Sequence, residues 1–170
     1  LLRIVKAAAG FIKDVQTDKI TRPSLVPCGQ PFGIRLVTDG VMVVELEDLE
    51  GVCPAAECGI KEGDVIISVN GKNVSGNKEI SKIISGSKGK PCTVEYRSGN
   101  DEKTATLTPV YYDGSYKAGI WVRDSSAGIG TLTFYNPETG AFGGLGHPIC
   151  DVDTKLPMPL SHGSVGEVKI

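Results

Sequence analysis

The sequence lacks the features that would place it in several large classes of protein. Its 170 residues include 18 Lys and Arg against 20 Asp and Glu, so no basic excess is present to neutralise phosphate groups. This balance argues against nucleic-acid binding as the main activity. No run approaches the roughly 18 consecutive apolar residues that a membrane-spanning helix requires. We therefore expect this stretch of chain to be soluble, with any membrane anchor outside it.

Cysteine is sparse and irregularly spaced. The five cysteines are Cys28, Cys53, Cys58, Cys92 and Cys150. An odd number with this spacing fits neither a complete disulfide framework nor a paired CxxC zinc site, so at least one thiol should be free. Cys58 and Cys92 lie among apolar residues and are expected to be structural thiols, with a Cys53–Cys58 bridge as the alternative.

What the sequence does have is glycine and proline, 22 and 10 residues, between short runs of Val, Ile and Thr. This pattern predicts a mainly β protein with some helix (α+β). Residues 1–24 form a lead-in to which we assign no function. After them, apolar runs at Ile34–Val37 and Val41–Val44 flank Asp39-Gly40, a tight-turn signal that predicts a hairpin.

The segment from residue 53 to 108 predicts two helices among three short strands. Pro54–Ala56 suits the first turn of a helix and Gly59 suits its C-terminal cap. Val65–Val69 is expected to be a strand with alternate residues on one face, followed by a tight turn at Asn70-Gly71. A helix over Asn77–Ser85, with Asn77 as N-cap, would place three isoleucines on one stripe. A hairpin of Thr93–Arg97 and Lys103–Thr108 completes the segment.

This order of elements resembles a PDZ domain of the bacterial protease-associated type over residues 25–110. Such domains bind an extended peptide as an added strand beside an exposed sheet edge. The resemblance implies Ile34–Val37 as the receiving strand, with the second helix as the opposite wall. The peptide-binding residues that it implies are Gln30, Phe32, Gly33, Ile34, Leu36, Ile80 and Ile84. The alternative is a domain that binds nothing and only supports or gates its neighbour.

The character of the sequence changes near residues 111–117, where we place a domain boundary. A strand over Thr131–Tyr135, a turn over 136–140 and a returning strand over Ala141–Leu145 would form a hairpin that ends just before His147. Glycines surround this histidine and allow close backbone approach. Composition alone favours a structural histidine, and the glycine-dense turn leaves a structural and a catalytic role equally open.

Two stretches of the second half, GIWVRDSSAGIGTLTFYNPETG and GGLGHPICDVDT, together with LVPCGQPFGIRL at residues 25–36, resemble the stage IV sporulation protein B peptidase family. That resemblance implies that residues 117–170 are the N-terminal part of a chymotrypsin-like β-barrel serine peptidase domain, with His147 as the catalytic base. In that family the aspartate and serine follow well downstream, so we expect both beyond Ile170 and this fragment to be inactive. We give neither role to the nearby Asp151, Asp153, Ser161 or Ser164.

By the same resemblance, the intact protein is a serine endopeptidase without a cofactor. It would cleave itself and a regulatory subunit of a membrane protease complex, and so trigger intramembrane proteolysis and activation of a late sigma factor. It would act, anchored to a membrane, in the space between the two membranes of the developing spore. The alternative is a peptide-binding adaptor that has lost catalysis.

Three further interpretations rest on residues of the second half. A Cys150–His147 dyad is disfavoured, because residues three apart in an extended strand point to opposite faces. A metal site built from His147, Asp151, Asp153 and His162 lacks a recognised ligand spacing, and we predict none. The single tryptophan, Trp121, is expected to pack in the core of the second domain, with packing across the joint between domains as the alternative.

Overall fold

The computed structural model describes residues 22–144 and 149–168. Its two helices in these ranges are α1 (Pro54–Glu57) and α2 (Asn77–Gly86). The strands of the largest sheet are β2 (Pro31–Leu46), β3 (Val65–Val69), β4 (Lys72–Asn73), β5 (Cys92–Ser98), β6 (Asp101–Leu107), β9 (Ile120–Thr131) and β12 (Leu160–Gly166). The smaller sheets contain β1 (Val26–Pro27), β10 (Phe134–Tyr135) and β11 (Phe142–Gly143), and β7 (Val110–Tyr112) with β8 (Ser115–Lys117).

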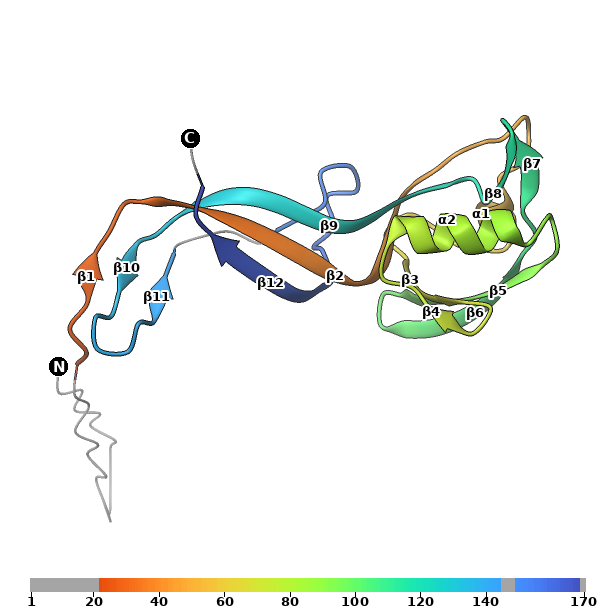
Figure 1. The fold of residues 1–170 in the computed structure, drawn as a ribbon. Helices are drawn as coiled ribbons and strands as arrows, with labels where there is room; N and C mark the ends of the chain where they lie inside the picture. Colours follow the sequence, from red (N-terminus) through yellow and green to blue (C-terminus); the bar gives the residue numbers. More distant parts are fainter. Residues whose placement is uncertain (1–21, 145–148, 169–170) are drawn as a thin grey trace, which may run out of the picture.

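The molecule is long, with a packed end and an extended arm (Figure 1). At the packed end, α1 and α2 lie with β3 to β8 in a PDZ-like arrangement, which confirms the predicted mainly β fold class. The arm is formed by β2, β9 and β12, and the small sheet β1-β10-β11 lies at its far end. Within the described residues, no helix is long and apolar enough to cross a membrane.

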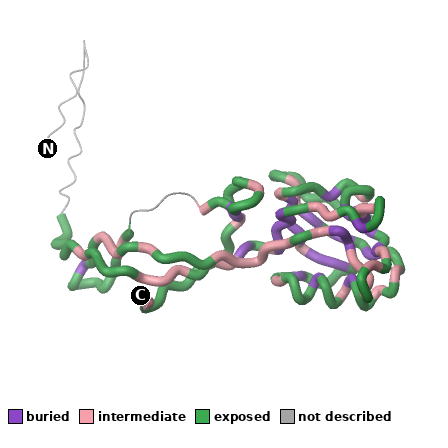
Figure 2. Tube along the Cα trace, turned by 90° about the horizontal axis from the view of Figure 1, so that it is seen from above, coloured by how far each residue is buried: buried purple, intermediate pink, exposed green. Residues whose placement is uncertain are grey.

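One hydrophobic core holds the packed end together. Its buried members come from β2, β3, β5, β6 and both helices, and include Val41, Val43, Ile66, Val94 and Leu107. Figure 2 shows the buried positions gathered at this end, while the arm is exposed or half-buried over most of its length. The fold is therefore anchored at one end of the molecule.

The predicted hairpin at Asp39-Gly40 is wrong, because Pro31–Leu46 is one continuous strand. Antiparallel pairing with β9 runs along both halves of β2, with a register shift between Val37 and Met42. At this irregularity Gly40 has φ +89°. A turn signal is local, whereas pairing with β9 is a long-range interaction that the local pattern does not contain.

Most of the other predicted elements of the packed end are confirmed. α1 begins at Pro54, Gly59 follows it with φ +89°, and Asn70-Gly71 forms a turn with φ positive at both residues. In β3, however, Ile66 is buried and Ile67 only half-buried, because a register shift between Ile66 and Ser68 breaks the expected alternation.

The cysteines agree with expectation, whereas the start of α2 differs from it by one residue. All five cysteines lie within the described residues and all are free, so the alternative Cys53–Cys58 bridge is absent. Burial raises the pKa of the Cys58 thiol, which keeps it protonated near neutral pH. The N-cap of α2 is Gly76 rather than Asn77, and it makes no side-chain capping bond.

Candidate functional site

A groove lies between α2 and the first residues of β9. It has a volume of about 380 Å³ and is lined on the helix side by Ile80 and Ile84 and on the strand side by Ile120 and Val122. These four side chains make an apolar floor. The strand is held in place by antiparallel pairing of Ile120–Arg123 with Met42–Leu46 of β2.

The alternation of β9 explains which side chains face the groove. Ile120 and Val122 point to one side and pack against the core, whereas Trp121, which pairs opposite Glu45, is 57% exposed. The expected core packing of Trp121 is therefore wrong. Among the described strands, β9 pairs only with β2, so its other edge faces α2 and is available to an added peptide strand.

The two ends of the groove are closed by different contacts. At one end, the Asn77 backbone N–H donates to Asp124 Oδ2 at 3.0 Å, so a residue of β9 takes the place of the missing side-chain cap of α2. At the other end, the ring of Tyr116 packs over Gly89, where a Cβ would come within 2.7 Å of it. The geometry suits an extended segment that lies along the whole helix.

The structure distributes the predicted peptide-binding residues over separate surfaces. Ile80 and Ile84 line the groove beside α2. Phe32, Ile34 and Leu36 instead line a hollow on the arm, together with residues 128–131 of β9. Gln30 lies in a third hollow, with Phe142. Gly33 pairs with Ile129 and with Gly166 inside the arm. Peptide binding by these seven residues stays a prediction.

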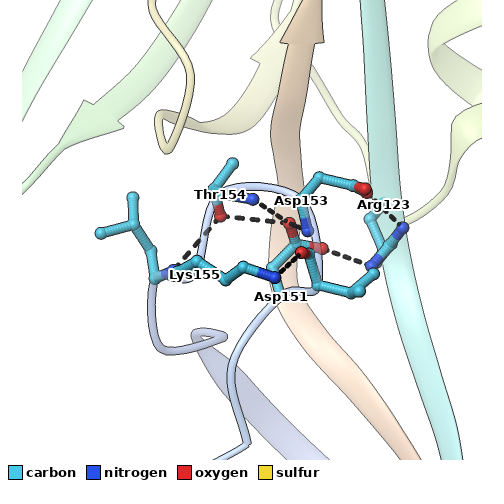
Figure 3. A network of polar contacts seen from close by, with 7 residues as sticks. Arg123, Asp151, Asp153, Thr154 and Lys155 are labelled. Carbon is cyan, nitrogen blue, oxygen red and sulfur yellow. Dashed lines mark hydrogen bonds and ion pairs between the residues drawn. The ribbon is translucent and has the colours of Figure 1, made fainter.

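Next to the groove, Arg123 of β9 holds a loop of the second half (Figure 3). The Arg123 guanidinium donates to the buried carboxylate of Asp151 and, at 2.8 Å, to Asp153 Oδ2. Asp151 Oδ1 also accepts the backbone N–H groups of Asp153 at 3.0 Å and Thr154 at 2.8 Å. Leu156 of the same loop contacts Gly63, so the loop rests on the packed end.

The environment of Asp151 fixes its charge. Burial alone would raise the pKa of this carboxyl, but the hydrogen bonds from the N–H and hydroxyl groups of Thr154 and the N–H of Asp153, together with Arg123, outweigh it and lower the pKa. Asp151 therefore stays ionised at neutral pH. Asp151, which lies four residues after His147 in the sequence, organises the loop at 149–158.

The remaining candidate residues lie apart from this network or outside the description. His147 lies outside the described residues, so its contacts and its role stay predictions. The exposed Cys150 faces Pro157 across an isolated bridge, and His162 lies on β12 with its Nδ1 3.3 Å from Ser161 Oγ.

Sequence reasoning missed the part that β9 takes in this site. Ile120, Val122, Arg123 and Asp124 contact α2 or the loop at 149–158, but none was a candidate. The alternation of apolar residues at 120 and 122 was a usable strand signal. The partners of Arg123 and Asp124 are 28 and 47 residues away in the chain, beyond any local pattern.

Comparisons with known proteins agree with this architecture. Residues 52–98, which include α1, β3 and α2, match a PDZ domain family. Residues 114–170, which include β9, the loop at 149–158 and β12, match the family described as SpoIVB peptidase S55. The resemblance found in the sequence is confirmed, because one match is to a PDZ domain family and the other to a peptidase family.

Individual relatives share only part of their length with this chain. A candidate zinc metalloprotease of Lactococcus lactis is 36% identical over 52% of this chain and 19% of its own length. Serine protease HTRA1 of Xenopus laevis is 40% identical over 42% of this chain and 15% of its own length. A solved PDZ domain of an SdrC-like protein from Listeria monocytogenes has TM-score 0.44 and 23% identity, and covers 51% of this chain and 90% of its own.

Proposed function

We propose that this chain is the peptide-binding and histidine-bearing part of a serine endopeptidase. The observation that carries the proposal is the match of residues 114–170 to the SpoIVB peptidase S55 family, a stretch that contains His147. In this mechanism His147 takes the proton of a serine nucleophile, and an aspartate orients the imidazole. The serine and aspartate would be supplied from outside these 170 residues, so the fragment alone would be inactive.

The PDZ part would hold the peptide that is to be cut or sensed. An extended peptide can add to the free edge of Ile120–Arg123, with its backbone bonded to β9 and its alternate apolar side chains directed toward Ile80 and Ile84. In this binding mode, specificity would depend on an extended backbone and on the spacing of apolar side chains rather than on charge. It suits a peptide or protein substrate, including a segment of the enzyme's own chain.

The cellular role is the finer part of the proposal and rests on the family resemblance. The intact protein would be membrane-anchored between the two membranes of a developing spore. There it would cleave itself and a regulatory subunit of a membrane protease complex, which would start intramembrane proteolysis and activate a late sigma factor.

The test uses the full natural gene product, with and without His147→Ala. Self-cleavage and digestion of a loosely folded protein are followed by mass spectrometry, and circular dichroism checks that both proteins are folded. We expect only the parent to cut. Equal cutting by both proteins would remove His147 from the mechanism.

A peptide-binding adaptor is the second candidate, and the groove beside α2 favours it because the groove needs no catalytic residue. Its prediction is the opposite one for catalysis: neither the parent nor His147→Ala would cut. Binding of an apolar extended peptide would still be lost on Ile80→Asp in α2, and because Ile80 is buried in the hydrophobic core, circular dichroism must show that this variant stays folded. Glu79→Ala on the same helix leaves the apolar floor intact and serves as the control.

A further inference from the structure

Two segments far apart in the sequence carry the same pattern. Residues 33–37 read Gly-Ile-Arg-Leu-Val and residues 119–123 read Gly-Ile-Trp-Val-Arg, each with glycine, isoleucine and then an aliphatic residue two positions on. In the structure the second segment pairs with Met42–Leu46. The first lies on the arm, paired with β9 on one side and β12 on the other.

The chain between residue 37 and residue 42 is built for a reversal. Asp39-Gly40 is a strong two-residue hairpin signal. Such a turn needs positive φ at both residues, and Gly40 already has it at +89°, whereas Asp39 would have to change its backbone conformation. If the chain turned there, Val37 would lie opposite Met42 and Leu36 opposite Val43. These are the positions that Arg123 and Val122 occupy now.

The match extends to the end of the strand. The pairing of β2 with β9 has a register shift between Val43 and Glu45. With that irregularity kept, Arg35 would lie opposite Glu45 and Ile34 opposite Leu46, so Ile34 would replace Ile120 and Leu36 would replace Val122. The two apolar positions stay apolar, and Arg35 gains a carboxylate as its cross-strand neighbour.

We propose that residues 33–37 and 119–123 compete for the same edge of Met42–Leu46, so that the chain exchanges between the observed arm and a second arrangement with a hairpin at Asp39-Gly40. In the second arrangement Leu36 and Ile34 face Ile80 and Ile84 of α2. The exchange changes which strand borders the peptide groove. It rests on strand pairing alone and stands whether or not the intact protein is a peptidase.

Several contacts hold the observed arrangement as the major one. Residues 33–37 pair with both β9 and β12, and these pairs would be lost on reversal. Arg97 Nη2 lies 3.2 Å from Asp39 Oδ2, and the Asp39 N–H donates to the Pro159 carbonyl at 2.7 Å. Thr38 is buried and its hydroxyl donates to the Asp124 carbonyl at 2.8 Å, which also holds β9 in place. The side chains of residues 31–37 are exposed or half-buried, so little apolar burial opposes the exchange.

Disulfide trapping tests the exchange in the 170-residue chain with its native cysteines replaced. Glu45→Cys with Arg35→Cys reports the second arrangement, and Glu45→Cys with Trp121→Cys reports the observed one. Glu45→Cys with Ala127→Cys is the control. Residue 127 pairs with residue 35 in the observed structure and does not lie opposite residue 45 in either arrangement. Oxidation traps a minor state, so a population of about 1% accumulates as the 35–45 disulfide.

Substitutions at Asp39 and Gly163 are expected to change the populations of the two arrangements. Asp39→Asn favours the hairpin turn, whereas Asp39→Val disfavours positive φ at that residue. Both remove the carboxylate that binds Arg97, so their difference isolates the backbone preference. Gly163→Val would push β12 from β2, because a Cβ there comes within 2.8 Å of Leu36 Cδ2.

We expect the 35–45 disulfide to form faster than the control pair, faster still with Asp39→Asn or Gly163→Val, and at the control rate with Asp39→Val. Formation at the control rate in the Asp39→Asn background overturns the proposal. If the cysteine-free chain does not fold, 5-fluorotryptophan at the single tryptophan replaces the trap. A second ¹⁹F resonance that grows in Asp39→Asn supports exchange, and one unchanged resonance in all variants refutes it.

Discussion

The two halves of β2 form one strand but have different surroundings. Val41 and Val43 are fully buried beside β3 and β9, whereas Phe32, Ile34 and Leu36 are half-buried between β9 and β12. The first group is held by apolar packing from two helices and several strands. The second is held by backbone pairing with strands that have little behind them (Figure 2).

This comparison separates pairing from burial as sources of stability. Net hydrogen-bond contributions are modest because the unfolded chain bonds to water instead, whereas each fully buried aliphatic side chain contributes about 1.5–3 kcal/mol. We therefore expect the arm to open locally at lower free energy than the core. The predictions below test this difference from the largest effect to the smallest.

The largest effect is expected from a matched pair of isoleucine truncations. Ile66→Ala in the core should lower the free energy of unfolding by about 2–5 kcal/mol, since it removes a buried side chain and leaves a cavity. Ile129→Ala on the arm, where the side chain is 66% exposed, should change it by less than about 0.5 kcal/mol. Urea denaturation followed by circular dichroism measures both. Equal losses would mean that the arm and the core unfold as one tightly packed unit.

The same division explains what the sequence could and could not predict. Elements set by local signals, such as Pro54 at the start of α1 or the turn at Asn70-Gly71, were predicted correctly. Asp39-Gly40 carries an equally strong local signal, yet it lies inside a continuous strand. The outcome there depends on β9, some 80 residues later, and no local pattern encodes that pairing.

The second prediction concerns the loop that Arg123 attaches to the junction of core and arm. Asp151→Asn should lower the free energy of local opening of residues 149–158 by about 1–3 kcal/mol. The substitution removes a buried charged acceptor that has several donors. Hydrogen exchange with mass spectrometry over that segment measures the loss. Asp153→Asn, at a side chain 52% exposed, is the control and should change opening by less than about 1 kcal/mol.

A third, smaller effect is expected where β9 caps α2. Asp124→Ala removes the acceptor of the Asn77 N–H and should destabilise the first turn of α2 by about 0.5–1 kcal/mol. Amide exchange of residues 77–80 should rise while that of β5 does not. Asp124→Asn keeps an oxygen acceptor and should restore most of the protection. If both variants exchange like the parent, the contact does not stabilise the helix.

The candidate site could be predicted from the sequence only where a single helix or strand supplies its residues. Ile80 and Ile84 follow the helical period, so the helix wall of the groove was visible in the sequence. The strand wall comes from Ile120 and Val122, which were assigned to another domain. Arg123 and Asp124 are ordinary charged residues in the sequence, and only the fold places their partners beside them.

At neutral pH the smallest effect is the pH dependence of the loop, which is absent there and in strong acid is bounded by the loss in Asp151→Asn. The folded-state pKa of Asp151 is lowered below its unfolded value of about 3.9. Its stabilisation is therefore complete above that value and declines as the pH falls through the folded pKa. The Thr154 amide resonance, whose N–H donates to Asp151, should be constant from pH 7 to pH 5 and move only in stronger acid. A midpoint at or above the unfolded value would mean that Arg123 and the loop amides do not stabilise the carboxylate, and Asp153→Asn should leave the midpoint in place.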